Sequence, residues 1–90
     1  MCAHLLIVED DETVRDFLVD NLREDGHTVS TAGGVKEGAL ALRRQGAEIA
    51  LVDVSLPDGS GLDLVRMIRD GEAGTPDIGV IAVSGRGTEQ

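Results

Sequence analysis

Two unbroken aliphatic runs, each ending in carboxylates, most constrain what this chain can fold into. The first run, Leu5–Val8, is followed by Glu9 and Asp10, and the second run, within Glu48–Asp53, ends at Asp53. Continuous aliphatic runs of this length are typical of strands covered on both faces, as in parallel sheets. The sequence therefore predicts at least two buried strands with acidic residues at their carboxyl ends.

Segments with helical periodicity separate the aliphatic runs. The predicted strands are His4–Val8, His27–Thr31, Glu48–Asp53 and Asp77–Val83. The predicted helices run from the acidic cluster to a stop at Gly26, from Val35 to Gln45, and onward from an N-cap at Ser60. Their expected inner faces are Val14, Phe17, Leu18 and Leu22 in the first helix, Val35, Ala39 and Leu42 in the second, and Leu62, Val65 and Ile68 in the third.

The resulting order β-α-β-α-β-α-β predicts one α/β domain over residues 1–90. Strands joined by helical crossovers are parallel, and the crossovers are right-handed. We expect a flavodoxin-like, doubly wound parallel sheet with strand order 2-1-3-4. The segment Gly85–Gln90 resembles a loop that enters another helix. A domain of this kind usually continues with a fourth helix, a fifth strand and a fifth helix, so we expect the chain to be part of a longer protein.

Composition narrows the functional classes. The net charge is −9, which argues against direct binding of nucleic acid or an anionic membrane by this segment. The only cysteine, Cys2, cannot form an intramolecular disulfide, and no apolar stretch approaches the ~18 residues of a membrane helix. The four residues before the first aliphatic run, Leu5–Val8, leave no room for a signal peptide. These observations favour a cytoplasmic domain.

The acidic residues indicate a particular chemistry. If the first and third strands are neighbours, Glu9, Asp10 and Asp53 meet at the carboxyl edge of the sheet, where parallel sheets bind their ligands. Three converging carboxylates repel each other unless a cation lies between them, and Mg²⁺ suits oxygen ligands of this kind. One carboxylate could then act as a nucleophile toward a phosphoryl group. Taken singly, Asp10 and Asp11 could instead cap the first helix, and Asp53 could be a turn residue.

Three motifs in this order resemble the receiver domains of two-component response regulators. They are Leu5–Asp11, Leu51–Gly61 and Val80–Gly85, and the resemblance extends from Leu5 to about Arg86. It implies that Asp53 is the phosphoacceptor in a site that binds Mg²⁺. By the same resemblance, the metal ligands are Asp10, Asp53, Glu9 acting through water, and the backbone carbonyl of Ser55.

The resemblance also implies parts of a switch. Ser84 would be the switch hydroxyl that reaches the phosphoryl group, and Pro57 and Gly61 would shape the loop after Asp53. Receiver domains carry a lysine at the end of the fifth strand. The only lysine here, Lys36, lies on the second predicted helix and cannot be that residue.

The expected function is that of a phosphoacceptor switch in a phosphorelay, with self-catalysed phosphorylation and dephosphorylation but no turnover of a substrate. The expected partner is a sensor histidine kinase or a histidine phosphotransfer domain, and the output partner is unknown. The edge of the fourth strand could support self-association.

Two alternatives differ from this reading. The chain could be a receiver-like interaction module that works without phosphorylation. Asp10–Val14 also weakly resembles the motif of haloacid dehalogenase phosphohydrolases, with Asp10 as nucleophile and Glu12 as acid.

Overall fold

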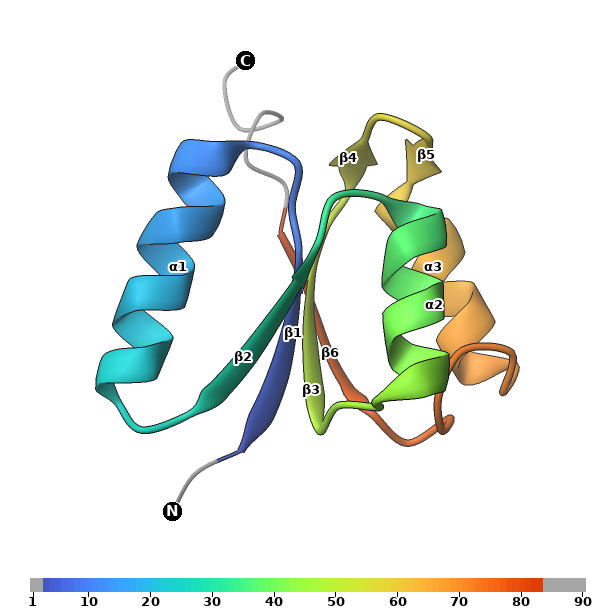
Figure 1. Cartoon of the computed structure of the whole chain (residues 1–90). Coiled ribbons are helices and arrows are strands. Elements are labelled where there is room, and N and C mark those ends of the chain that lie inside the picture. The colour runs from blue at the N-terminus through green and yellow to red at the C-terminus, as the bar shows by residue number, and fades with distance from the viewer. Residues whose placement is uncertain (1–2, 84–90) are drawn as a thin grey trace.

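A four-stranded parallel sheet forms the centre of the fold. The computed structural model describes residues 3–83, and Figure 1 shows α1 on one face of the sheet and α2 and α3 on the other. The strands of this sheet are β1 (His4–Val8), β2 (Thr28–Ala32), β3 (Ile49–Asp53) and β6 (Gly79–Val83). The helices are α1 (Glu12–Glu24), α2 (Val35–Arg44) and α3 (Gly61–Arg69). A small hairpin consists of β4 (Ser55–Leu56) and β5 (Gly59–Ser60).

The strand order β2-β1-β3-β6 confirms the predicted topology, with β6 as the fourth strand of the expected 2-1-3-4 order. Strand β1 lies between β2 and β3, and all three pairings are parallel. In register, Val8 lies opposite Ala32 on one side and Val52 on the other. The ends of β1 and β3 therefore coincide at the same edge. The structure begins β2 and β6 slightly later than predicted, at Thr28 and Gly79.

The core lies mainly between the sheet and the pair α2 and α3. The predicted inner residues of α2 are all buried, as are Gly38 and the α3 residues Leu64 and Ile68. Gly38 allows α2 to lie close to the sheet. A Cβ atom at Gly38 would lie 2.9 Å from Leu64 Cδ2 and 3.2 Å from Val8 Cγ2, too close for a side chain without repacking.

The predicted inner face of α1 is wrong in part. Val14 and Phe17 are 42% and 66% exposed, and Leu18 and Leu22 are only half-buried. Within residues 3–83, α1 is the only helix on its face of the sheet (Figure 1). Leu5 and Ile7 of β1 are buried, but among the described elements no second helix or strand packs against the side of α1 that carries Phe17.

The predicted inner stripe of α3 is also wrong in part. Leu62 is 51% exposed, whereas Gly61, Leu64 and Ile68 are buried. The first turn contains apolar residues on two adjacent faces, so periodicity alone does not decide which face turns inward. The close approach of Gly61 to β3 fixes the rotation of the helix and turns Leu62 outward.

Local end signals behave as the sequence predicted. Asp11 is the N-cap of α1, Ser60 is the N-cap of α3, and Gly26 follows α1 with a φ of 93°. A positive φ of this kind favours glycine because it has no Cβ. None of the helices within residues 3–83 is both long and apolar enough to cross a membrane.

Candidate functional site

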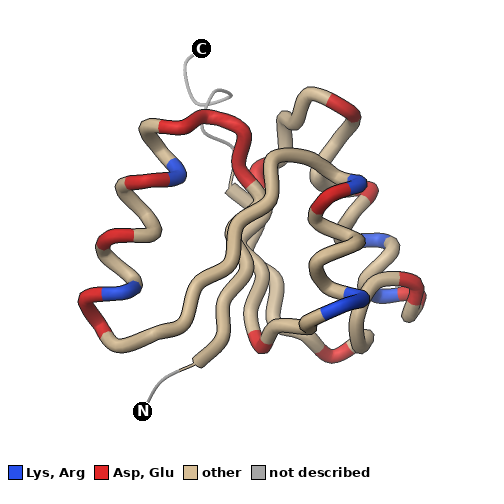
Figure 2. Tube along the Cα trace, viewed as in Figure 1, with Lys and Arg blue, Asp and Glu red and all other residues tan. Residues whose placement is uncertain are grey.

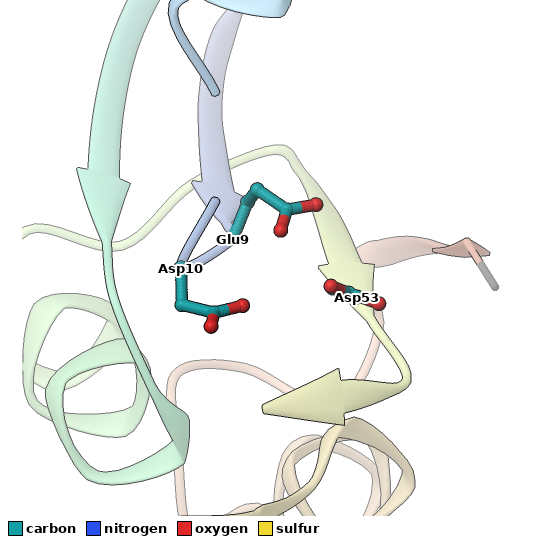
Figure 3. A group of neighbouring side chains, drawn as sticks. All are labelled: Glu9, Asp10 and Asp53. Atoms are coloured by element: carbon teal, nitrogen blue, oxygen red, sulfur yellow. The ribbon is translucent and has the colours of Figure 1, made fainter. Parts of the chain in front are cut away.

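Three carboxylates meet at the carboxyl edge of the sheet. Glu9 and Asp10 follow directly after β1, and Asp53 is the last residue of β3. Figure 3 shows Glu9 and Asp10 reaching from the end of β1 toward Asp53. One oxygen from each residue lies within 4.8 Å of the other two. The structure thus brings together the three acidic side chains that the sequence singled out.

Backbone contacts hold the first acidic segment in place. The Glu9 amide donates to the Ala32 carbonyl at 2.9 Å, which extends the pairing between β1 and β2 by one residue. The Asp11 amide donates to Glu9 Oε2 at 3.0 Å and thereby fixes the Glu9 side chain. Asp10 lies between them with an exposed side chain. Glu9 is therefore the buried, fixed member of the cluster, and Asp10 is the exposed one.

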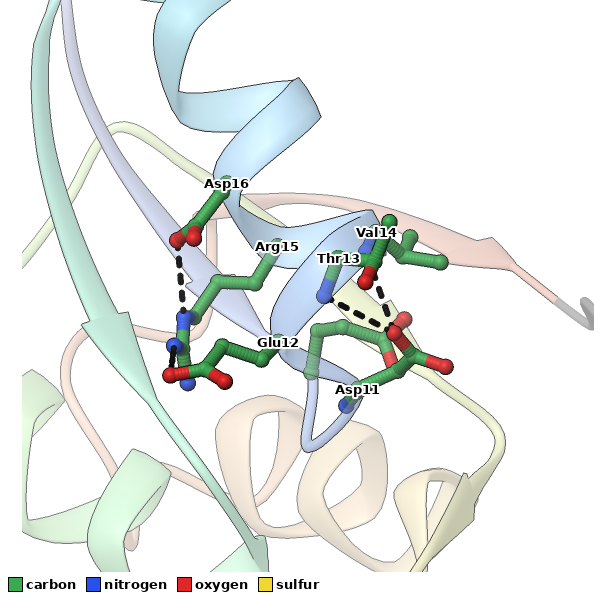
Figure 4. Close-up of polar contacts among 7 residues, drawn as sticks. Asp11, Glu12, Thr13, Val14, Arg15 and Asp16 are labelled. Atoms are coloured by element: carbon green, nitrogen blue, oxygen red, sulfur yellow. Dashed lines mark hydrogen bonds and ion pairs between the residues drawn. The ribbon is translucent and has the colours of Figure 1, made fainter.

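Asp11 has a different role from its neighbours. Its Oδ1 accepts from the amides of Thr13 and Val14 at 2.9 and 3.1 Å, as Figure 4 shows. These are the bonds of an N-cap, and a carboxylate also suits the positive end of the helix dipole. The capping role that could have explained both aspartates is filled by Asp11 at the start of α1. Asp10 lies one residue before the cap and faces the site instead.

Asp53 is oriented by the segment that follows it. Asp53 is 8% exposed as a residue, and its Oδ1 accepts a hydrogen bond from the Ser55 amide at 3.2 Å. The Val54 amide donates to the Val83 carbonyl at 2.9 Å, which ties the end of β3 to the end of β6. The Asp53 carboxylate is therefore held at a fixed edge position, with its second oxygen free of the Ser55 bond.

The cluster has an unfavourable charge balance. Burial raises the pKa of the Glu9 carboxyl, and the hydrogen bond from the Asp11 amide partly opposes this increase. The nearby carboxylates of Asp53 and Asp10 raise the pKa of Glu9 further. Two full charges at 4.8 Å repel by roughly 3 kcal/mol at an effective dielectric constant of about 20. That exceeds the gain from one ordinary hydrogen bond, about 1 kcal/mol. Figure 2 shows acidic residues gathered where β1 leads into α1. A proton or a cation in the cluster would relieve this repulsion.

The donor set fits a hard divalent cation. Carboxylate oxygens are the ligands that Mg²⁺ prefers, and Mg²⁺ commonly uses one or two carboxylates and keeps several waters. The cluster offers one exposed carboxylate, Asp10, and two that are nearly buried, Glu9 and Asp53. A site open on the Asp10 side has room for waters and for an incoming group.

The segment after Asp53 forms a tight hairpin that the sequence reasoning treated only as a loop. Ser55 pairs with Ser60 and Leu56 with Gly59, so Pro57 and Asp58 occupy the turn. Pro57 suits the second position of such a turn, and Gly59 has a φ of 149°, which favours glycine. The signal that could have identified this turn is the run Pro57-Asp58-Gly59, since each residue has a known turn preference.

Gly61 allows α3 to start directly against the site. A Cβ atom there would overlap the carbonyl oxygen of Asp53 and would lie 2.8 Å from Val52 Cγ1. The Gly61 amide donates to the Val54 carbonyl at 2.8 Å. The expectation that Gly61 shapes this loop therefore has a steric basis in the backbone of Asp53.

Other predicted residues lie away from the cluster or outside the described chain. Ser84, the expected switch hydroxyl, lies outside the described residues. Lys36 is in the first turn of α2, as predicted. Glu12 is exposed and lies 3.6 Å from Arg15 in an ion pair on α1 (Figure 4), so its position does not favour the acid role of the phosphohydrolase alternative.

Comparison with known proteins shows which family has this arrangement. The sequence model of the response regulator receiver domain matches residues 5–90. The chain is 34% identical over 87 residues to the KDP operon transcriptional regulatory protein KdpE of Escherichia coli K12. This match covers 97% of the chain and 37% of KdpE. It is 35% identical over 72 residues to the probable transcriptional regulatory protein TcrX of Mycobacterium tuberculosis, covering 80% of this chain and 31% of TcrX.

Solved structures agree with the sequence matches. The receiver domain of the sensor histidine kinase PA1611 from Pseudomonas aeruginosa PAO1, with magnesium coordinated in its active site cleft, superposes with a TM-score of 0.87 at 25% identity. That match covers 99% of this chain and 72% of the other. The non-phosphorylated HemR receiver domain from Leptospira biflexa gives a TM-score of 0.82 at 30% identity, covering 92% of this chain and 64% of the other.

A doubly wound parallel sheet with a carboxylate cluster at the carboxyl ends of β1 and β3 is the arrangement of a signalling domain of the receiver type. The chain belongs to the response regulator receiver domain family of two-component systems. It spans about a third of the length of the curated relatives that it matches.

Proposed function

We propose that Asp53 accepts a phosphoryl group in a Mg²⁺-dependent reaction and that this modification is the signal the domain carries. The observation that supports the proposal best is the convergence of Glu9, Asp10 and Asp53 within 4.8 Å at one edge of the sheet. Asp53 combines near-complete burial of its side chain with a fixed orientation, as expected of a nucleophile rather than a solvated turn residue.

Asp10 and Asp53 would hold the metal directly, Glu9 would act through water, and the Ser55 backbone carbonyl would complete the ligands from the protein. When bound, Mg²⁺ would neutralise charge on the phosphoryl oxygens and allow the carboxylate to approach them. Glu9 would keep the cation near β1, because its own carboxylate is fixed by the Asp11 amide.

The chemical step would be an in-line transfer. The Asp53 oxygen that does not accept from Ser55 attacks phosphorus on a phosphohistidine, and the P–N bond breaks. The electron pair of that bond returns to the histidine nitrogen, which takes up a proton, and Asp53 becomes an acyl phosphate. Attack by water on the acyl phosphate would restore the Asp53 carboxylate and release inorganic phosphate. The domain would catalyse both steps on itself and is thus proposed as a regulatory phosphoacceptor.

A phosphohistidine donor implies a protein partner, a sensor histidine kinase or a histidine phosphotransfer domain. Asp10 is exposed, so the cluster is open to solvent on that side, which suits a donor carried by a macromolecule. We propose that Ser84 senses the phosphoryl group and that the domain acts in the cytoplasm, where such a kinase can reach it. Pro57 and Gly61 would keep the intervening loop in its active shape.

The test uses a small phosphodonor such as acetyl phosphate, with and without Mg²⁺, and intact-mass spectrometry. The wild-type chain should gain one phosphoryl mass in the presence of Mg²⁺, and Asp53→Asn should gain none. Asp63→Asn is a matched control, because Asp63 is an exposed acid whose ion pair with Arg66 lies on α3. A phosphoryl gain that survives Asp53→Asn would overturn the assignment.

We also propose that the β6 edge supports self-association. Ile81 on this strand is 51% exposed, and within residues 3–83 β6 pairs only with β3. An exposed apolar edge strand is a template for pairing with another chain. Sedimentation velocity of this 90-residue chain should show concentration-dependent dimers that Ile81→Lys reduces, and a monomer at all concentrations would contradict the idea.

A further inference from the structure

Helix α2 begins without a capping side chain of its own. Its N-cap is Gly34, which offers no side-chain acceptor for the first free amides of the helix. Uncapped amides at a helix start usually find a side-chain oxygen from the N-cap residue itself. In this fold the acceptor for the Val35 amide comes instead from a residue 23 positions after Val35.

Asp58 supplies the missing cap from the β4–β5 hairpin. Its Oδ1 accepts from the Val35 amide at 2.8 Å and its Oδ2 accepts from the Lys36 amide at 3.1 Å. Both carboxylate oxygens are thus used, one on each of two successive amides. These bonds, first from Val35 and then from Lys36, lower the pKa of the Asp58 carboxyl. Asp58 therefore remains a charged acceptor at neutral pH.

Gly34 leaves room for the Asp58 carboxylate because it has no Cβ atom. A Cβ atom at Gly34 would lie 2.6 Å from Asp58 Oδ1 and 3.1 Å from Asp58 Cγ. The Gly34 backbone is extended, so another residue could adopt its φ and ψ, and the restriction comes from the carboxylate alone. At the neighbouring Gly33 a Cβ atom would meet only Glu37 Oε1, at an ordinary 3.5 Å.

The bonds tie the start of α2 to the loop of the site. Asp58 occupies the turn of a hairpin whose first strand begins at Ser55, two residues after Asp53. The Ser55 amide orients Asp53, and the Ser55 carbonyl is a proposed metal ligand. A displacement of the turn would therefore reach Asp53 through a short, hydrogen-bonded path.

We propose that Asp58 is a positioning residue for the site: by capping α2 across the fold, it holds the β4–β5 hairpin, and hence Ser55 and Asp53, in the geometry that binds Mg²⁺. The proposal rests on the proposed function for its metal, but the structural tie between Asp58 and Ser55 stands apart from it. Without the hydrogen bonds of Asp58, the β4–β5 hairpin would populate other positions. The apparent affinity for Mg²⁺ would then fall in proportion to the fraction of molecules whose hairpin is in the position that binds Mg²⁺.

The test uses three single variants, Asp58→Ala, Asp58→Asn and Gly34→Ala. A double variant combines Gly34→Ala and Asp58→Ala in one chain. Amide hydrogen exchange by NMR reads the structure, and titration with Mg²⁺ alone reads the site. We expect Asp58→Ala to weaken Mg²⁺ binding about two- to fivefold and to quicken exchange of the Ser55 amide. Asp58→Asn keeps one acceptor oxygen and should be intermediate.

Gly34→Ala should weaken Mg²⁺ binding in the same way, because its Cβ displaces the carboxylate. The double variant should bind Mg²⁺ no more weakly than the weaker-binding single variant, because both changes remove the same contact. Gly33→Ala is the matched control and should leave Mg²⁺ binding unchanged.

Two outcomes would separate the tie from the proposed function. If Asp58→Ala quickens exchange at Val35 and Lys36 but leaves Ser55 exchange and Mg²⁺ affinity unchanged, Asp58 is only a helix cap and the inference is overturned. If the wild type binds no Mg²⁺, the proposed function fails, and the exchange of the Ser55 amide in Asp58→Ala still decides whether the tie exists.

Discussion

Replacing Gly61 by alanine is the sharpest perturbation of the link between fold and site. The new Cβ atom would overlap the Asp53 carbonyl oxygen and would lie 2.9 Å from the Asp53 carbonyl carbon and 2.8 Å from Val52 Cγ1. Two of these three neighbours are backbone atoms of the strand that carries the proposed nucleophile. They can move only if the end of β3 or the start of α3 moves.

The expected change in stability has a definite sign. Glycine to alanine in a helix ordinarily stabilises by up to about 1 kcal/mol, because alanine has the higher helix propensity. Overpacking a closely packed position costs about 1–3 kcal/mol, and overlap with the backbone places Gly61 at the upper end of that range. We therefore expect Gly61→Ala to lower the free energy of unfolding by about 2 kcal/mol.

Urea denaturation followed by far-ultraviolet circular dichroism measures this change, since the chain has no tryptophan or tyrosine for fluorescence. At about 1 kcal/mol per molar urea, the midpoint should fall by about 2 M. Gly79→Ala is the control, because its Cβ would lie 3.5 Å from Ile49 Cγ1, an ordinary contact, and it should change stability by less than about 0.5 kcal/mol. A Gly61→Ala variant as stable as the wild type would refute the steric argument.

Three further outcomes follow from burial and charge. Ile68→Val removes one methyl group from a fully buried side chain and should lower the free energy of unfolding by about 1 kcal/mol in the same assay; no change would mean that α3 packs differently. Hydrogen bonds from the amides of Val35 and Lys36 lower the pKa of the Asp58 carboxyl below its usual 3.8. The stabilisation from the charged Asp58 carboxylate is therefore complete above pH 3.8 and is lost as the pH falls through the lowered pKa. The stability difference between wild type and Asp58→Asn should therefore shrink in acid, and a constant difference would contradict this. Since the pKa of Glu9 is raised above 4.5, its ionisation opposes folding at neutral pH, so Glu9→Gln should raise the metal-free melting temperature and reduce the added stability from Mg²⁺. A lower melting temperature would contradict the charge argument.

The strand order and the place of the acidic site could be predicted because the evidence for both is local. The aliphatic runs that form β1 and β3 are continuous, and each passes directly into its acidic residues. Parallel pairing then brings Glu9, Asp10 and Asp53 to one edge, whatever the details of the helices. The core face of α2 was also predicted correctly, because Val35, Ala39 and Leu42 follow the helical spacing and all three are buried, whereas Leu40 is 44% exposed.

What could not be predicted depends on tertiary contacts. The rotation of α3 is set by the close approach of Gly61 to the Asp53 backbone. The spacing of apolar residues carries no information about this contact, and so Leu62 was assigned to the wrong face. Phe17 was expected to turn inward, but an amphipathic pattern does not reveal how many elements cover a face. Asp58 and Gly34 lie far apart in the sequence, and their contact is visible only once the hairpin is placed beside α2.

The most direct test of the central claim is to identify the residue that becomes phosphorylated. The wild-type chain is treated with acetyl phosphate and Mg²⁺ and then with borohydride, which reduces an aspartyl phosphate to homoserine. Peptide mass spectrometry then locates the conversion. The structure predicts conversion at Asp53 alone and none when Mg²⁺ is left out. Conversion at Asp10, or at no aspartate of the folded chain, would contradict the account.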